Sequence, residues 1–138
     1  MSSLQAPTPR SRRPSSPGAA LGRKSGTNVR EPVTWIVDTG ADISVVKKSV
    51  GDRFDYARVR GLSASPTTGR GGIIVVSGIT TEFEVTDGLG TRKSTSSSKN
   101  VGVKSSDSGS NLLGMEQIAD AKAELLWNPG TRSGSLRV

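Results

Sequence analysis

The stretch from Thr34 to Val46 reads TWIVDTGADISVV, and it decides what kind of fold this chain can adopt. A run of strand-forming apolar residues leads directly into Asp38, Thr39 and Gly40, and a second apolar run follows. Two such runs around a glycine-containing turn predict two strands, with Asp38 at the end of the first. One interpretation is a turn in which the Asp38 carboxylate accepts backbone amides. The other is a carboxylate that faces a cleft and carries out chemistry.

Further strands are predicted along the rest of the chain, because short apolar or alternating runs recur between Ser-, Gly- and Asp-rich segments. The predicted strands cover residues 33–37, 43–46, 73–76, 79–85, 101–103 and 135–138. One helix is predicted from Met115 to about Leu126, since apolar residues recur there at helical spacing and Asn-Pro-Gly follows. Segment 91–110 contains eight serines, and apart from its short strand this composition predicts a mobile loop. The expected class is all-β with one short C-terminal helix.

The composition excludes several kinds of chemistry. The chain has 138 residues, enough for one small domain, and contains neither cysteine nor histidine. Disulfides, Ser-His-Asp and Cys-His schemes and the usual zinc ligand sets are therefore excluded. Catalysis would use carboxylates, lysines, hydroxyls or the single tyrosine. With only 4% aromatic residues the core is thin, so a partner subunit is expected to add stability.

The positive charge is concentrated in residues 1–30, which hold six of the nineteen Lys and Arg residues and no acid. These residues are also rich in Pro and Ser, which predicts a disordered basic tail or linker over 1–30 and a folded domain over 31–138. A nucleic-acid partner is expected only through this tail. No segment is apolar over the length of a membrane span and no secretory signal is visible, so no membrane partner and a cytoplasmic location are expected.

Three segments of the sequence resemble the retroviral-type aspartic proteases, or retropepsins. WIVDTGADISVV at 35–46 is similar to their active-site loop, and GRGGIIVV at 69–76 is similar to their glycine-rich flap. NLLGMEQI at 111–118 resembles the late motif of two apolar residues and a glycine that opens a helix. The three occur in the order of the family, and the similarity covers residues 31–138. It implies a small closed β-barrel-like half-site domain that is homodimeric, since each member chain carries one Asp-Thr-Gly.

The resemblance also implies a function and a set of site residues. The chain would be an aspartic endopeptidase of retroviral or retrotransposon type that processes a polyprotein, with a water activated between the Asp38 carboxylates of two subunits. Thr39 would brace the two loops across the dimer, and Gly40 would present its backbone to an extended peptide substrate. The substrate would also contact Ala41, Asp42, Gly69, Arg70, Gly71, Gly72, Ile73 and Leu112. No cofactor and no metal are expected.

Two positions complicate this interpretation. Met115 stands where many retroviral members have a basic residue that pairs with the acid equivalent to Asp42, and retrotransposon members commonly differ there. Asp107 lies in an Asp-Ser-Gly triplet that could imitate the catalytic one, but no buried strand precedes it, so a loop residue is predicted.

Two other functions stay open at this point. The first is an inactive retropepsin-like module for dimerisation or peptide binding. The second is a small β domain that binds nucleic acid, which the near-neutral region 31–138 and the lack of aromatic stacking platforms disfavour.

Overall fold

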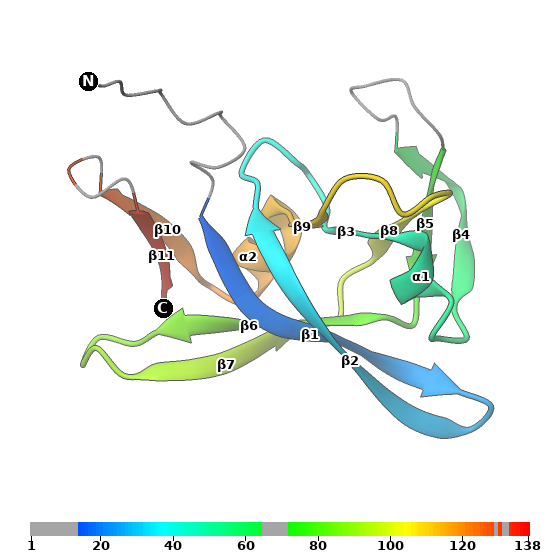
Figure 1. The fold of residues 1–138 in the computed structure, drawn as a ribbon, viewed down its shortest axis with the longest axis horizontal. Helices are drawn as coiled ribbons and strands as arrows, with labels where there is room; N and C mark the ends of the chain where they lie inside the picture. Colours follow the sequence, from blue (N-terminus) through cyan, green and yellow to red (C-terminus); the bar gives the residue numbers. More distant parts are fainter. Residues whose placement is uncertain (1–13, 65–71, 129, 131–132) are drawn as a thin grey trace, which may run out of the picture.

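Strands make up more than half of the described part of the chain. A computed structural model describes residues 14–64, 72–128, 130 and 133–138 (Figure 1). The strands are β1 (Ser15–Lys24), β2 (Thr27–Val37), β3 (Val45–Val46), β4 (Ala57–Ala64), β5 (Ile73–Ser77), β6 (Thr80–Thr86), β7 (Arg92–Ser97), β8 (Val101–Lys104), β9 (Asn111–Leu113), β10 (Glu124–Asn128) and β11 (Ser133–Arg137). The helices are α1 (Lys48–Gly51) and α2 (Met115–Asp120). The predicted all-β class with a short helix near the C-terminus is confirmed.

All of these strands join one hydrogen-bonded sheet. Its order is β10-β11-β6-β1-β2-β9-β3-β8-β5-β4, and β7 pairs with β6 beside this path. Figure 1 shows the long twisted β1–β2 hairpin running across the molecule, with β6 crossing β1, to which it is paired, and the β6–β7 hairpin extending away from it. Most neighbours are antiparallel, but β9 runs parallel to β2 and β8 runs parallel to β3. The β2–β9 pair brings the late motif and the Asp38 loop, which are far apart in the sequence, side by side.

The N-terminal hairpin corrects the predicted domain boundary. Residues 15–30 were expected in a disordered tail, but they form β1 and the first part of β2, which pair from Ser15 opposite Ile36 to Lys24 opposite Thr27. The connecting residues Ser25 and Gly26 both have positive φ, 51° and 78°, as a two-residue type I′ hairpin turn requires. Residues 1–13, the rest of the expected tail, lie outside the described part of the chain.

The physical reason for this error is that β1 is built from small residues. Ala19 and Ala20 are completely buried although they add little to a hydrophobicity count. Prolines exclude a helix but are tolerated in strands where their missing N–H is not needed. Pro17 lies just before the stretch in which β1 pairs with β6, from Gly18 to Leu21, and therefore leaves that ladder intact.

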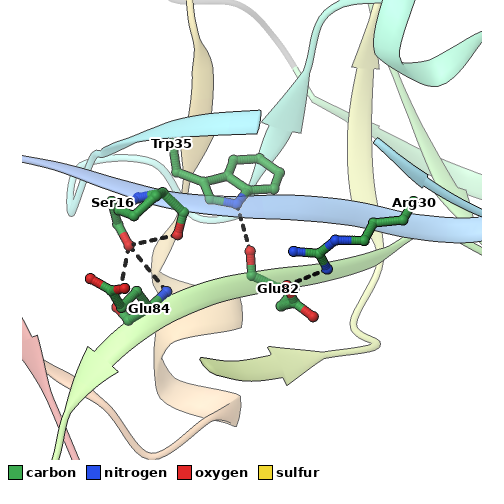
Figure 2. Close-up of polar contacts among 6 residues, drawn as sticks. Ser16, Arg30, Trp35, Glu82 and Glu84 are labelled. Atoms are coloured by element: carbon green, nitrogen blue, oxygen red, sulfur yellow. Dashed lines mark hydrogen bonds and ion pairs between the residues drawn. The ribbon is translucent and has the colours of Figure 1, made fainter. Parts of the chain in front are cut away.

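Two side chains complete the junction between β1 and β6 (Figure 2). The Ser16 hydroxyl accepts the Glu84 N–H and donates to the Glu84 carbonyl, both at 3.2 Å, and so extends the ladder past Pro17. The fully buried indole of Trp35 passes over Gly18 and donates its N–H to the Glu82 carbonyl at 2.8 Å. The junction is therefore fixed by hydrogen bonds as well as by packing.

The core gathers around Trp35 and Phe83, both completely buried. The buried positions of β6 alternate with half-buried ones, as its sequence predicts, so that Phe83 and Val85 face the core. Leu113 of β9 and Ile118 of α2 belong to the same cluster. A single core therefore supports both the long hairpin and the segments around Asp38.

The predicted helix is too long. α2 ends at Asp120, and Lys122 then adopts a left-handed conformation with φ 58°. Leu125 and Leu126, expected in the helix, lie in β10 opposite Leu136 and Ser135 of β11. Their spacing fits a helix, but β11 offers a strand partner that spacing alone does not reveal.

The expected mobile loop at 91–110 is also wrong over residues 92–97, which form β7. β7 pairs with β6 from Thr81 opposite Ser97 to Thr86 opposite Arg92, and the short strand predicted at 101–103 is present as β8. Serines suffice in β7 because only Ser97 in that strand is buried.

Candidate active site

The Asp38 loop begins directly where β2 ends. The Asp38 N–H donates to the Leu113 carbonyl at 3.0 Å, and the Ala41 N–H donates to the Asp38 carbonyl at 3.1 Å. Asp38 Oδ1 accepts the Gly40 N–H at 3.0 Å, so the backbone-capping turn that the sequence allowed is present. Asp38 and Ala41 are half-buried, while Thr39, Gly40 and Asp42 are exposed. The loop thus presents backbone and short side chains at the surface, while Leu113 holds the Asp38 backbone and Gly40 contacts the Asp38 carboxylate.

The late motif supports both flanks of this loop. β9 lies between β2 and β3, with Leu112 opposite Ile36 on one side and opposite Val45 on the other. Leu113 is fully buried, whereas Leu112 is half-buried. Two of the three segments that carry the resemblance therefore meet in space.

Gly114 allows the loop and the start of α2 to approach each other closely. A Cβ there would lie 2.3 Å from the backbone carbon of Ile43, so no other residue fits without displacing the chain. The Met115 N–H donates to the Ala41 carbonyl and the Glu116 N–H to the Asp42 carbonyl, both at 2.9 Å. The first amides of a helix lack intrahelical acceptors, and here the loop supplies them.

Two polar residues behind the loop were not predicted. Ser44 and Gln117 are fully buried, and the Ser44 N–H donates to Gln117 Oε1 at 2.8 Å. The only sequence signal is that each is a polar residue beside apolar ones that were expected to be buried, Ser44 before Val45 and Gln117 before Ile118.

The base of the predicted flap is described, but its tip is not. Gly69, Arg70 and Gly71 lie outside the described residues. Gly72 is exposed, and its N–H donates to the Ser105 hydroxyl at 3.1 Å. Ile73 begins β5, which pairs with β4 on one side and with β8 on the other.

Ile73 is linked to the active-site loop through Gly102. A Cβ at Gly102 would meet Ile73, Val45 and Ile43 at 2.6, 3.3 and 3.5 Å, so these three side chains gather over one glycine. The half-buried Ile73 therefore lies in the same apolar cluster as Ile43, which directly follows Asp42.

Asp107 is a loop residue, as predicted. It is exposed, and its Oδ1 accepts the Ser49 N–H at 2.8 Å at the start of α1. That backbone hydrogen bond lowers the pKa of the Asp107 carboxyl. The same short helix carries Lys48, whose pKa is raised chiefly by its hydrogen bond to Asp52. Asp107 thus has a structural role in capping a helix.

The described residues contain no group of three or more His, Cys, Asp or Glu side chains that could hold a metal ion. No helix in the described ranges combines the length and the apolar character needed to cross a membrane.

Comparison with known proteins gives similarity to solved structures. No family model and no curated protein matches the chain. Among solved structures, the chain is similar to EIAV protease complexed with the inhibitor HBY-793, with 21% sequence identity and a TM-score of 0.42. The similarity covers 88% of this chain and 99% of that one. The function is therefore inferred below from the geometry of the site.

Proposed function

We propose that this chain is one half of an aspartic endopeptidase of retroviral or retrotransposon type. The observation that carries the proposal is the support given to Asp38. It ends a strand with a buried core face, its N–H is held by Leu113, and the segment containing Leu113 lies between both strands that flank the loop. A turn that only capped backbone amides would not require a second segment inserted beneath it.

The chemistry follows from pairing two such loops in a homodimer. Two carboxyl groups about 3 Å apart cannot both ionise cheaply, so they share one proton. The ionised Asp38 takes a proton from a water whose oxygen attacks the scissile carbonyl carbon, and the protonated Asp38 of the second copy donates a hydrogen bond to the carbonyl oxygen. The pair then returns a proton to the amide nitrogen, and the C–N bond breaks. No nucleophilic side chain is needed, which suits a chain without His or Cys.

The remaining site residues take roles that suit their positions. Thr39 is exposed at the turn, where it would meet the same loop of the second copy, and Gly40 would offer its backbone to an extended peptide. Asp42 would contact the peptide backbone next to it. Leu112 and Ile73 would contribute apolar surface to the peptide side chains.

Residues 69–71 would form the closing tip over the bound peptide. Substrate binding by Gly69, Arg70, Gly71 and Gly72 stays a prediction from the resemblance, as do the cytoplasmic location and the polyprotein substrate.

The test is peptide cleavage by the purified chain at acidic to neutral pH. Asp38→Asn keeps an oxygen that can accept the Gly40 N–H but cannot act as a base, so cleavage should fall by at least about 10³-fold. Asp107→Asn, in the other Asp-Xaa-Gly triplet, is the matched control and should retain activity. A statine-type inhibitor should block the wild-type chain.

A mixing experiment tests the two-chain site directly. Wild-type and Asp38→Asn chains are mixed in equal amounts and allowed to exchange. If both chains of a two-fold dimer must be wild type, the mixture should have about one quarter of the activity of wild-type chain at the same total concentration. A linear loss of activity with the wild-type fraction, or cleavage by a monomer, would overturn the proposal.

A second function is favoured by one observation. Among the described residues, Asp42 makes no ion pair, and the position from which a basic residue would reach it holds Met115, which is 40% exposed. A dimer that binds peptides without cleaving them under any condition would support the inactive module instead.

A further inference from the structure

A buried polar cluster lies behind the active-site loop, outside the residues that the proposed function assigns to substrate. Ser44 donates to Gln117 Oε1 twice, from its N–H and from its hydroxyl, both at 2.8 Å. The same hydroxyl accepts the Gly114 N–H at 2.9 Å. Gln117 Nε2 donates to the carbonyls of Asn100 at 2.7 Å and Lys99 at 3.3 Å. The Gln117 amide therefore uses two acceptor and two donor positions without contact with solvent.

The cluster ties three separate segments together. Ser44 belongs to the end of the active-site loop, Gln117 to α2, and Asn100 to the residues just before β8. A fully satisfied buried network favours one arrangement, because any shift leaves a buried donor or acceptor without a partner. An apolar pair would fill the same space but would tolerate several arrangements.

One peptide group connects this cluster to Asp38. The Leu113 carbonyl and the Gly114 N–H belong to the same planar unit. Its N–H donates to the Ser44 hydroxyl, and its carbonyl accepts the Asp38 N–H at 3.0 Å. Because the unit is rigid, fixing its N–H side also fixes the direction in which its carbonyl holds the Asp38 backbone.

We infer that Gln117 is a positioning residue, which acts through Ser44 and the Leu113–Gly114 peptide to set the orientation of the catalytic Asp38. The inference rests on the proposed function for its effect on catalysis. It assigns to Gln117 no contact with the substrate, so loss of its amide changes the rate of the chemical step and leaves substrate binding largely unchanged.

The test compares Gln117→Met with a matched core variant. Methionine keeps the length and much of the volume of glutamine but removes every hydrogen bond of the amide. Val85→Ala, in β6, truncates a buried side chain of the core away from the loop and serves as the control for general destabilisation. For Gln117→Met we expect kcat to fall about 10- to 100-fold with KM within about twofold, since displacements near 1 Å have costs of this size. Val85→Ala should lower the melting temperature with kcat nearly unchanged below it.

Two results would overturn the inference. One is a kcat loss in Gln117→Met no larger than that in Val85→Ala, measured where both are folded and dimeric. The other is a rise in KM at constant kcat, which would place Gln117 in substrate binding. If Gln117→Met does not fold, Ser44→Ala decides the matter, because it removes one hydroxyl and leaves the Ser44 N–H bond to Gln117. A threefold or larger loss of kcat at constant KM supports the inference, and an unchanged kcat overturns it.

A readout without catalysis separates this inference from the proposed function. If the wild-type chain cleaves no peptide, the proposed function fails, but the positioning contact is still measured by amide hydrogen exchange. The Asp38, Ala41 and Met115 amides, which all bond within or onto the loop, should exchange at least tenfold faster in Gln117→Met than in Val85→Ala. Equal exchange in the two variants would overturn the inference.

Discussion

The β1–β2–β6 region and the region around the Asp38 loop are held together in different ways. In the first, β1 pairs with β2 along its whole length, and small residues let a buried Trp35 cross between strands. In the second, β3 has two residues and β9 has three, and side chains such as Ser44 and Gln117 supply much of the hydrogen bonding. A long ladder of backbone hydrogen bonds tolerates a single substitution unless the new side chain collides with the backbone. Short strands with polar supports should lose their geometry, and hence activity, before the whole fold is lost.

The largest effect is expected from Gly18→Ala in the β1–β2–β6 region. A Cβ there would lie 2.1 Å from the Glu82 carbonyl oxygen and 2.8 Å from Trp35 Nε1, at the end of the β1–β6 ladder. Because the atom it strikes is backbone, the loss of stability should exceed about 3 kcal/mol, at or above the upper end of ordinary overpacking. Chemical denaturation measures it.

Gly88→Ala is the matched control for this substitution. No atom lies within 4 Å of a Cβ at Gly88, so its stability should change by no more than about 0.5 kcal/mol. Similar losses in the two variants would mean that glycine flexibility, and not the close approach of β1 to β6, sets the effect at Gly18.

Gly114→Ala makes the corresponding change in the active-site region. Its Cβ would lie 2.3 Å from the Ile43 carbon and 2.8 Å from the Ser44 nitrogen. The loop can move outward because it is partly exposed, so we expect a smaller stability loss of about 1–3 kcal/mol. Cleavage should nevertheless fall about 10²-fold, since the displaced segment holds Asp38. Denaturation measures the stability loss and peptide cleavage measures the activity loss on the same sample. A variant that is destabilised but fully active per folded dimer would contradict the idea that the active-site region loses activity before the whole fold is lost.

Trp35→Phe tests how much of the first region depends on one side-chain hydrogen bond. A smaller aromatic ring replaces the fully buried indole, and the Glu82 carbonyl loses the indole N–H. Leaving a partly buried acceptor without its partner should cost about 1–3 kcal/mol, and kcat should stay unchanged. Thermal unfolding measures the stability loss, and peptide cleavage measures kcat. A loss of activity beyond the unfolded fraction would show that the two regions are coupled.

Much of the site was predictable from the sequence because its signals are local. The Asp-Thr-Gly loop follows an apolar strand, and the alternation in β6 shows directly which residues face the core. The resemblance also singled out the late motif, and the parallel pairing of Val37 with Leu113 places that motif beside the loop.

The missed features all depend on pairing partners that composition and spacing do not reveal. β1 buries Ala19 and Ala20, which no hydrophobicity count singles out. Its prolines suggest disorder, and only its pairing with β2 shows that the segment is a strand. Leu125 and Leu126 have helical spacing, and only pairing with β11 makes them a strand. The bond between Ser44 and Gln117 is similarly invisible in the sequence, because neither residue has a local pattern that names the other.

The smallest effect is expected at Asp87, in the turn between β6 and β7, which lies far along the sheet from Ser44 and Gln117. Its Oδ1 accepts the N–H groups of Leu89 and Thr91, both at 2.9 Å, and these backbone hydrogen bonds, that from Thr91 first, lower the pKa of its carboxyl. A carboxyl whose pKa is lower in the folded chain stabilises the fold above its unfolded value of 3.8, and this contribution is lost as the pH falls through the folded value. Asp87→Asn keeps an acceptor oxygen but no charge, so the wild-type chain should melt slightly higher at neutral pH, and the gap should narrow below pH 3.8. Melting curves over a pH series measure this gap. A gap that widened towards acid would show that the ionised carboxylate does not stabilise the turn, and cleavage at neutral pH should be the same in both chains because β6 and β7 carry no site residue.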